Sequence, residues 1–311
     1  MMDKRSFLVT DADTGLRLDA FLARELGLGP RPAKRLISGG FVQVAGKTRL
    51  PSCKLVSGSL VTLTENSPAS SFPPDLAGAI CLVHATADYA SFFKPAGLHS
   101  ACVTGSAAPS LEGFLRQSWD RIRKTAGTLL PETSPTLLNR LDRETSGLVT
   151  AALTRDAASR FRAWEADGLV RKDYLAIVRG QLTAPLRLRG RLDTDKRKKT
   201  RVYAENTPDE TRHTLVAPLQ ADNCRNPFDF PVTPVTARIY RASRHQIRAH
   251  LADAGFPLLG DTLYGVTPEV FPLHLHHVRL AMPAFDAAIP PSWQSFPTIC
   301  DRKILLLLPS P

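Results

Sequence analysis

This sequence lacks paired cysteines, long apolar runs and glycine-rich nucleotide motifs. Its five cysteines include no CxxC pair, so the sequence predicts neither a zinc site nor a dithiol redox site. Scattered cysteines of odd number instead indicate reduced thiols, and we expect a cytoplasmic protein. Because no GxGxxG or Walker sequence is present, we expect no nucleotide cofactor.

The two ends of the sequence lack the features of membrane targeting. The start, MMDKRSFLVTDADTG, has three aspartates and no apolar core of signal length, so neither a secretory nor a transit peptide is predicted. Near the other end, ILLLLP at 304–309 is too short to cross a bilayer and favours a buried closing strand. We therefore expect no membrane partner.

Acidic residues are the scarcer charged type. The 311 residues include 29 Asp and Glu against 40 Lys and Arg, which gives a net charge of +11 and a pI near 9.7. A positive charge suits a polyanionic partner such as nucleic acid or, less specifically, an anionic membrane surface. Many basic proteins bind neither, so the charge alone leaves the partner open.

The segment 16–64 is patterned as a compact unit. Apolar spacing predicts a helix that ends at Gly27 and a second, basic helix from about Pro32 to Ile37. The alternating stretches FVQVAGKTRL and SLVTL predict two or three short strands. The segment holds eight basic and two acidic residues, so it carries more than half of the net charge.

This order of helix, basic helix and GGFVQVAGK hairpin resembles the alpha-L RNA-binding domain. The resemblance implies that residues 1–64 form such a domain, whose second helix and following loop bind structured RNA. By position it implicates four basic residues in RNA contact: Arg31, Lys34, Arg35 and Lys47.

A linker and a larger domain are predicted to follow. Residues 65–79 are rich in proline, serine and alanine and break both periodicities, so we expect a linker. Residues 80–311 mix strands and helices without regular alternation. This pattern predicts an α+β fold with a mixed, largely antiparallel sheet flanked by helices, rather than a doubly wound fold.

The stretch NRLDRETSGL, residues 139–148, contains candidates for chemistry. Taken alone it is typical of a turn, in which Asp142 and the hydroxyls bond to nearby backbone NH groups. Three other stretches accompany it: FFKPAGL, RKDYLAIVRG and RASRHQIRAHLADAGFPLLGDTLYG. In this order they resemble the motifs of the RluA-type pseudouridine synthases, over about residues 80–287.

The resemblance implies an isomerase that converts uridine in structured RNA to pseudouridine. Matched residue by residue, Asp142 is the catalytic aspartate, Tyr174 the active-site tyrosine and Arg248 the arginine that pairs with the aspartate. We expect further RNA contacts from four residues beside the motifs: Arg140, which would fill the space left by the turned-out uridine, and Lys172, Arg244 and His245. Two stretches depart from the motifs, because Asn139 replaces a usual histidine and Ala242-Ser243-Arg244 replaces a common GRT.

The reaction explains why these residue types are needed. Isomerisation breaks the bond between the anomeric carbon and the base nitrogen, and rejoins the base through carbon 5, so no cofactor is required. A carboxylate can attack the sugar carbon or remove its 2′ proton, and a nearby arginine keeps that carboxylate charged. A tyrosine can stack on the flipped base and help remove the proton from carbon 5.

A metal is not predicted from the histidine-rich stretch HLHH. Its histidines, His274, His276 and His277, have no carboxylate or cysteine at ligand spacing. We expect packing or RNA contact at these positions instead.

Other classes of function fit parts of the sequence. The first unit would suffice for a catalytically silent RNA-binding or ribosome-assembly factor. An N-glycosidase also breaks glycosidic bonds, although hydrolysis usually needs a second carboxylate, such as Glu144, to act on a water. For a synthase, the resemblance favours 23S rRNA of the large subunit, with tRNA as the alternative, and we expect a monomer.

Overall fold

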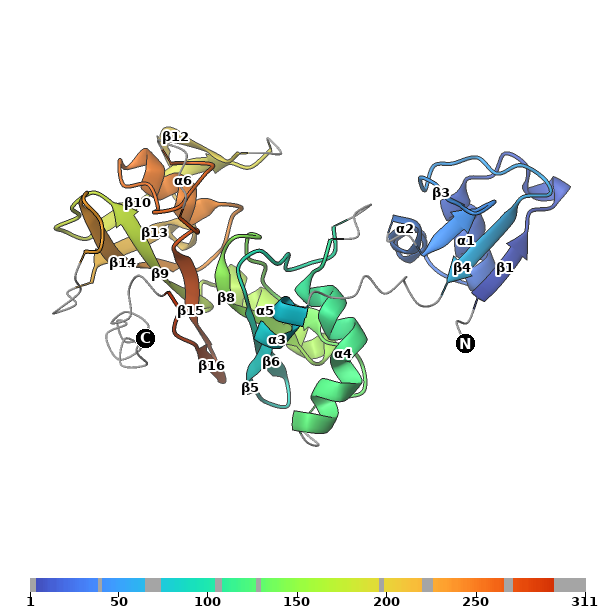
Figure 1. Cartoon of the computed structure of the whole chain (residues 1–311), viewed down its shortest axis with the longest axis horizontal. Coiled ribbons are helices and arrows are strands. Elements are labelled where there is room, and N and C mark those ends of the chain that lie inside the picture. The colour runs from blue at the N-terminus through green and yellow to red at the C-terminus, as the bar shows by residue number, and fades with distance from the viewer. Residues whose placement is uncertain are drawn as a thin grey trace. The chain divides into compact units, whose positions relative to one another are not determined.

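The structure is a computed structural model that divides the chain into two compact units (Figure 1). It describes residues 4–38, 41–64, 74–103, 108–126, 130–195, 199–219, 226–265 and 271–293. The units are Met1–Ala77 with Ala101–Phe114, and Gly78–Ser100 with Leu115–Pro311. The end of the predicted linker is helical, because Pro74–Ala79 form α3.

The first unit is a four-stranded antiparallel sheet packed against two helices. Its elements are β1 (Lys4–Leu8), η1 (Asp11–Asp13), α1 (Leu18–Leu26), α2 (Pro30–Ser38), β2 (Val42–Val44), β3 (Lys47–Thr48) and β4 (Leu60–Thr64), with sheet order β1-β4-β2-β3. As predicted, α1 ends at Gly27, which adopts the left-handed conformation at φ 61°. Strand β1 was not predicted.

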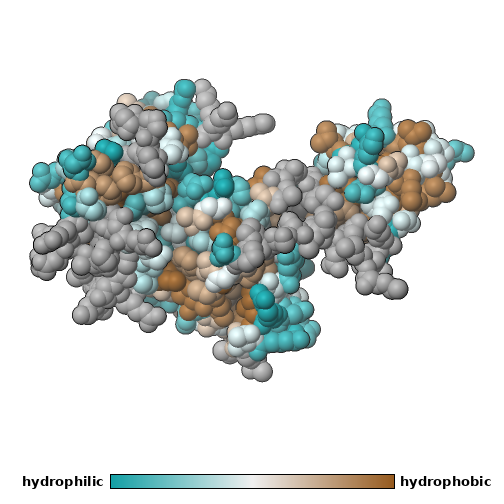
Figure 2. All heavy atoms as spheres, viewed as in Figure 1, coloured by the Kyte–Doolittle hydropathy of each residue, from teal (hydrophilic) through white to brown (hydrophobic). Residues whose placement is uncertain are grey.

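The surface of the first unit is both basic and apolar. Figure 2 shows apolar residues on its surface among hydrophilic ones. The exposed large apolar side chains there are Leu8, Leu28, Leu50, Val56 and Leu60. Arg31, Lys34 and Lys47 are exposed on the same unit.

The second unit is built on a ten-stranded sheet. Eight strands follow the order β10-β13-β14-β9-β15-β8-β6-β5, with β16 beside β15 and β7 beside β8. The strands are β5 (Cys81–Ala85), β6 (Tyr89–Lys94), β7 (Thr136–Leu137), β8 (Ser146–Ala152), β9 (Arg171–Arg179), β10 (Leu186–Leu188), β13 (Thr214–Pro218), β14 (Val232–Ile239), β15 (Leu275–Met282) and β16 (Phe285–Ala288). Apart from the parallel pair β8 and β15, the pairings among these described strands are antiparallel, which confirms the predicted α+β class.

Helices and a separate hairpin complete this part of the chain. They are α5 (Arg155–Ala166), α6 (Gln246–Asp253), η2 (Glu210–Arg212) and the hairpin β11 (Gly190–Asp193) with β12 (Arg201–Asn206). Helix α4 (Leu111–Ala126) begins in the segment assigned to the first unit and continues in the second from Leu115. Ala157 and Phe161 of α5 pack with Leu148 and Leu280 from β8 and β15 in one buried cluster. Helix α5 therefore covers this part of the sheet.

The parallel pair β8 and β15 depends on one glycine. Gly147 has φ +119°, and a Cβ there would lie 2.3 Å from His277 O, far inside van der Waals contact. Only a residue without a side chain lets the two strands approach this closely. This gives a structural reason for the glycine in the TSGL sequence.

Two further expectations concern the predicted closing strand and membrane-spanning helices. The predicted closing strand at 304–309 lies outside the described residues. Within the residues that are described, no helix is long and apolar enough to span a membrane.

Candidate active site

Asp142 lies in the turn between β7 and β8. Thr145 N donates to Asp142 O at 3.1 Å, so the stretch is a turn, as its composition indicates. Ser100 Oγ fixes the residue before Asp142, because it donates to Leu141 O at 2.9 Å and accepts from Leu141 N at 2.8 Å. The Asp142 side chain itself does not stabilise the turn by these bonds, and it is 25% exposed.

Arg248 of α6 links Asp142 to a second carboxylate. Its Nη1 donates to Asp142 Oδ2 at 2.9 Å. Its Nε and Nη2 donate to the two oxygens of Asp261, each at 2.8 Å. Asp261 is almost fully buried and also accepts from the backbone NH groups of Leu263 and Tyr264. Arg248 is therefore anchored at one end and presents one nitrogen to Asp142.

The charges of this pair support each other. Burial alone would raise the pKa of Asp261, but the hydrogen bonds from Arg248 outweigh it and hold that pKa below its ordinary value. Burial would lower the pKa of Arg248, and the bonds and charge of Asp261, followed by those of Asp142, raise it instead. Both groups stay charged, since removing either would leave the other buried without a counter-ion.

Tyr174 of β9 lies on the same side of the site and is 6% exposed. Its ring stacks on His277 of β15, with centroids 4.6 Å apart and 20° between the planes. Burial raises the pKa of Tyr174 above its ordinary value, and the charge of Asp142 adds to the effect. Tyr174 is therefore a neutral phenol, close enough to Asp142 for the carboxylate charge to raise its pKa.

Two residues that were not predicted as site residues, Asp261 and Lys94, are central to this arrangement. Asp261 lies in the quoted GDTLYG stretch, and its anchoring of Arg248 was not foreseen. Lys94, in the quoted FFKPAGL stretch, is fully buried and donates to Pro95 O and Leu98 O at 2.8 Å and to Arg143 O at 3.2 Å. Burial lowers the pKa of Lys94 to about 7. Lys94 thus clamps the backbone just after Asp142.

The predicted RNA-contact residues fall into different environments. Arg140 is exposed beside Asp142. His245 is the residue before α6, with its Nε2 3.7 Å from Asp142 Oδ2, and burial lowers its pKa. Arg244 is partly buried and donates to Thr194 O at 3.0 Å. Of the residues implicated in the first unit, Lys34 is 54% exposed.

Lys172, for which RNA contact is predicted, lies inside the second unit. Its side chain is 1% exposed, and its ammonium donates to Glu165 and, at 2.9 Å, to Tyr240 O. Burial lowers the pKa of Lys172 while Glu165 opposes the shift. The lysine is satisfied inside the fold and does not face a phosphate group.

The histidines of HLHH are packed inside the second unit. His276 accepts from Ser146 Oγ at 2.9 Å and donates to Ile289 O at 3.0 Å. Burial lowers the pKa of His276 to about 4 and that of His277 to about 3, so both are neutral. In the described part of the chain, no three ligand side chains are gathered closely enough to hold a metal ion.

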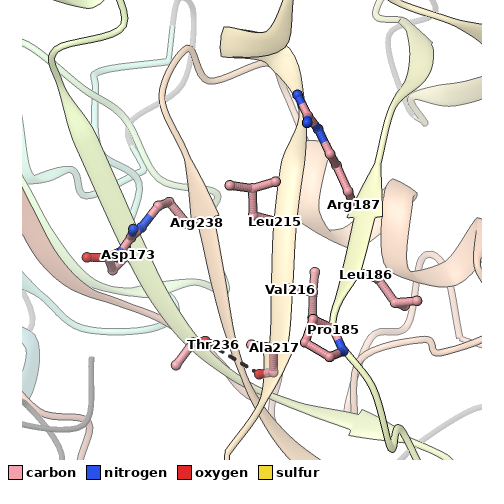
Figure 3. Close-up of a pocket in the computed structure, with 9 residues that line it drawn as sticks. All are labelled: Asp173, Pro185, Leu186, Arg187, Leu215, Val216, Ala217, Thr236 and Arg238. Carbon is pink, nitrogen blue, oxygen red and sulfur yellow. Dashed lines mark hydrogen bonds and ion pairs between the residues drawn. The ribbon is translucent and has the colours of Figure 1, made fainter. Parts of the chain in front are cut away.

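A pocket of about 340 Å³ lies on the other face of the sheet (Figure 3). Asp173 and Arg238 line one side of it and Arg187 lines another. Because neighbouring residues on a strand point to opposite faces, Asp173 faces away from Tyr174. This pocket is therefore separate from the site around Asp142.

The chain is similar to known pseudouridine synthases. The sequence profile for RNA pseudouridylate synthase matches residues 88–253. Ribosomal large subunit pseudouridine synthase C of Escherichia coli is 31% identical over 268 residues, which are 83% of this chain and 78% of that protein. An uncharacterized RNA pseudouridine synthase of Chloroflexus aurantiacus is 28% identical over 314 residues, covering 98% of this chain and 93% of that one.

Solved structures share the fold. The human RNA pseudouridylate synthase domain containing 1 protein matches with a TM-score of 0.52 and 20% identity, over 69% of this chain and 84% of that chain. At this identity the likeness concerns the fold alone.

Proposed function

Because the chain belongs to the RNA pseudouridylate synthase family, we propose that its conversion of uridine to pseudouridine in RNA is carried out by Asp142, Arg248 and Tyr174. The observation that supports this assignment is the 2.9 Å contact between Arg248 Nη1 and Asp142 Oδ2. An anchored arginine holds a carboxylate in one orientation, and the partial exposure of Asp142 leaves room for a sugar.

Asp142 starts the reaction at the sugar of the flipped uridine. Its carboxylate either attacks the anomeric carbon or removes the 2′ proton, and in both routes the bond to base nitrogen 1 breaks. The base turns and carbon 5 bonds to the anomeric carbon. In the first route this breaks the bond between the sugar and Asp142, and in the second route Asp142 returns the proton to the 2′ carbon. Carbon 5 then loses its proton and nitrogen 1 gains one. The exposed Arg140 enters the space that the uridine leaves in its stack.

Tyr174 contacts the base and takes part in the loss of the carbon 5 proton. A neutral phenol can accept that proton only as it passes its own hydroxyl proton on, and Asp142 is the neighbouring acceptor. The Tyr174→Phe variant should still cleave and turn the base, then stall before carbon 5 loses its proton. Quenched reactions analysed by mass spectrometry would reveal the stalled species. Unchanged pseudouridine formation would limit Tyr174 to contact with the base.

Product analysis tests the reaction class. Incubation with RNA that carries labelled uridine should leave the label in the RNA and yield labelled pseudouridine after digestion. Release of free uracil would show an N-glycosidase. Bound but unaltered RNA, tried across ribosomal and transfer RNA, would favour a silent RNA-binding factor.

We further propose that the first unit is an alpha-L domain and that 23S rRNA is the substrate. The exposed basic residues Arg31, Lys34 and Lys47 support RNA binding by this unit. The name of the Escherichia coli relative refers to the large ribosomal subunit, which supports the choice of substrate over tRNA. Pseudouridine maps of total RNA from cells with and without the gene would identify the target. We propose a cytoplasmic monomer, which size measurement in solution would test.

A further inference from the structure

We propose that His277 and Asn139 form a positioning pair that holds the Tyr174 ring in place relative to the turn that carries Asp142. The proposal rests on the role given to Tyr174 under the proposed function. Neither residue of the pair is assigned to contact the uridine. Their effect would act through Tyr174.

The pair meets at one backbone oxygen. His277 Nδ1 donates to Leu148 O at 2.6 Å, and Asn139 Nδ2 donates to the same oxygen at 3.3 Å. Asn139 Oδ1 also accepts from Thr150 N at 2.7 Å. Leu148 and Thr150 belong to β8, which begins directly after the Asp142 turn. Asn139 precedes that turn, so its side chain ties the two ends of the turn together.

His277 carries the link across to Tyr174. The two residues are opposite each other in the pairing of β15 with β9, and their rings stack at 4.6 Å. The pairing shifts register between His277 and Arg279, which marks a β-bulge or irregularity next to the site. A bulge changes the direction of the side chains beside it, so this irregularity helps to set the position of the His277 ring.

Tyr174 is almost fully buried, and its ring stacks on His277. In the part of the chain that the structure describes, its hydroxyl makes no hydrogen bond to the protein. The ring is therefore placed by packing, and the flat, neutral imidazole is the surface beneath it. Loss of that surface would let the ring tilt within the site.

The choice of a histidine at this position has a chemical reason. A carbonyl oxygen only accepts, so the His277 proton lies on Nδ1 and Nε2 carries a lone pair. Among the described residues, this buried Nε2 has no hydrogen-bond partner, which opposes stability. A phenylalanine would avoid that penalty but would lose the bond to Leu148. The histidine therefore fits a residue that must both stack and stay fastened to β8.

The close approach of the strands supports the same interpretation. His277 N and O lie within 2.6 Å of the place where a Cβ on Gly147 would be. Any other residue at 147 would push His277 away from β8 and lengthen its bond to Leu148. The pair therefore has a fixed backbone on both sides.

Single-turnover rates at saturating RNA test the proposal. His277→Ala should lower the rate constant by about tenfold or more while the RNA Kd stays within about twofold, because a misplaced ring slows chemistry more than binding. His277→Phe keeps the ring and should recover part of the rate. Asn139→Ala should also lower the rate constant, as His277→Ala does. Val278→Ala is the matched control, since Val278 is equally buried on β15 but packs in a different cluster.

A Tyr174→Leu background separates this proposal from the proposed function. If His277 acts through Tyr174, adding His277→Ala there should cause no further loss of rate. An equal loss in both backgrounds, or an unchanged rate for a folded His277→Ala protein, overturns the positioning pair alone. A normal rate for Tyr174→Leu itself overturns the proposed role of Tyr174. Should His277→Ala fail to fold, the same comparison is made with His277→Phe, whose full wild-type rate would count against the Leu148 bond.

Discussion

The two sides of the candidate site are stabilised in opposite ways. Asp142, Arg248 and Asp261 form a chain of charges in which every ion has a counter-ion, and Asp142 at its end is partly exposed. Tyr174 and His277 form a neutral stack from which charge is excluded by burial. The comparison shows that one site can place a carboxylate paired with an arginine beside a phenol whose pKa is raised by burial. Burial of Tyr174 adds to the difference in pKa that already exists between a carboxyl group and a phenol.

Removal of the Asp142 charge tests the charged side of the site and should have the largest effect on the reaction. Asp142→Asn should keep the fold, because Arg248 retains its two bonds to Asp261, while isomerisation falls by about 10³-fold or more. Melting temperature, RNA affinity and pseudouridine formation should be measured together. Glu144→Gln is the control, since Glu144 is exposed and forms an ion pair with Arg143 at 3.6 Å. A near wild-type rate for Asp142→Asn would end the assignment of Asp142.

Removal of the arginine should affect stability more than removal of Asp142. Arg248→Met leaves Asp261 buried without its partner, which should cost about 3–5 kcal/mol of unfolding free energy. Asp142 lies nearer to solvent, so Asp142→Asn should cost about 1 kcal/mol or less. Urea unfolding of both variants measures the difference. Equal losses would mean that Asp261 does not depend on Arg248.

The buried His277 should make the unfolding free energy depend on pH in the acid range. The pKa of His277 is about 3 in the fold against 6.5 ordinarily, so between these values the unfolded chain binds a proton that the folded chain excludes. The unfolding free energy therefore falls as pH falls below about 6.5, by about 1.4 kcal/mol per pH unit for each such histidine. His277→Phe should therefore make the unfolding free energy depend less on pH between pH 6 and 4.5. An unchanged slope would show that His277 is protonated in the fold.

Changes in the first unit should have the smallest effect on chemistry. Replacing Arg31, Lys34 and Lys47 together by Gln should weaken RNA binding and reduce its salt dependence, since phosphate contacts release counterions. Single-turnover rates at saturating RNA should stay within about tenfold, because these residues lie outside the motifs around Asp142. Salt titrations of RNA affinity and quenched-flow rates check the two parts separately. A complete loss of turnover with intact binding would contradict the separation.

The sequence predicted local features better than contacts. The helix that ends at Gly27, the α+β class and the largely antiparallel sheet follow from periodicity and turn residues. The turn at Asp142 follows from its composition. These features depend on neighbours in the chain, which the sequence displays directly.

The contacts of the site depend on residues far apart in the chain. Asp261 was part of a quoted loop, but nothing local shows that its carboxylate would meet Arg248. Lys172 was expected to contact RNA because it lies beside the motif around Tyr174, and its burial against Glu165 depends on the packing of α5 on the sheet. His277 was grouped with its neighbours as packing or RNA contact, and only the strand pairing brings it onto Tyr174. Single-sequence patterns contain no information on such pairings.

The pair of hydrogen bonds from Arg248 to Asp261 has a consequence for repeated turnover. In the proposed reaction Asp142 would give up its free negative charge, whether it bonds to the sugar or takes a proton. An arginine with no other partner would then swing toward water or RNA and would have to return before the next cycle. With Nε and Nη2 held by Asp261, Arg248 keeps its direction throughout. The site should therefore begin each cycle already assembled, with no recovery step between one uridine and the next.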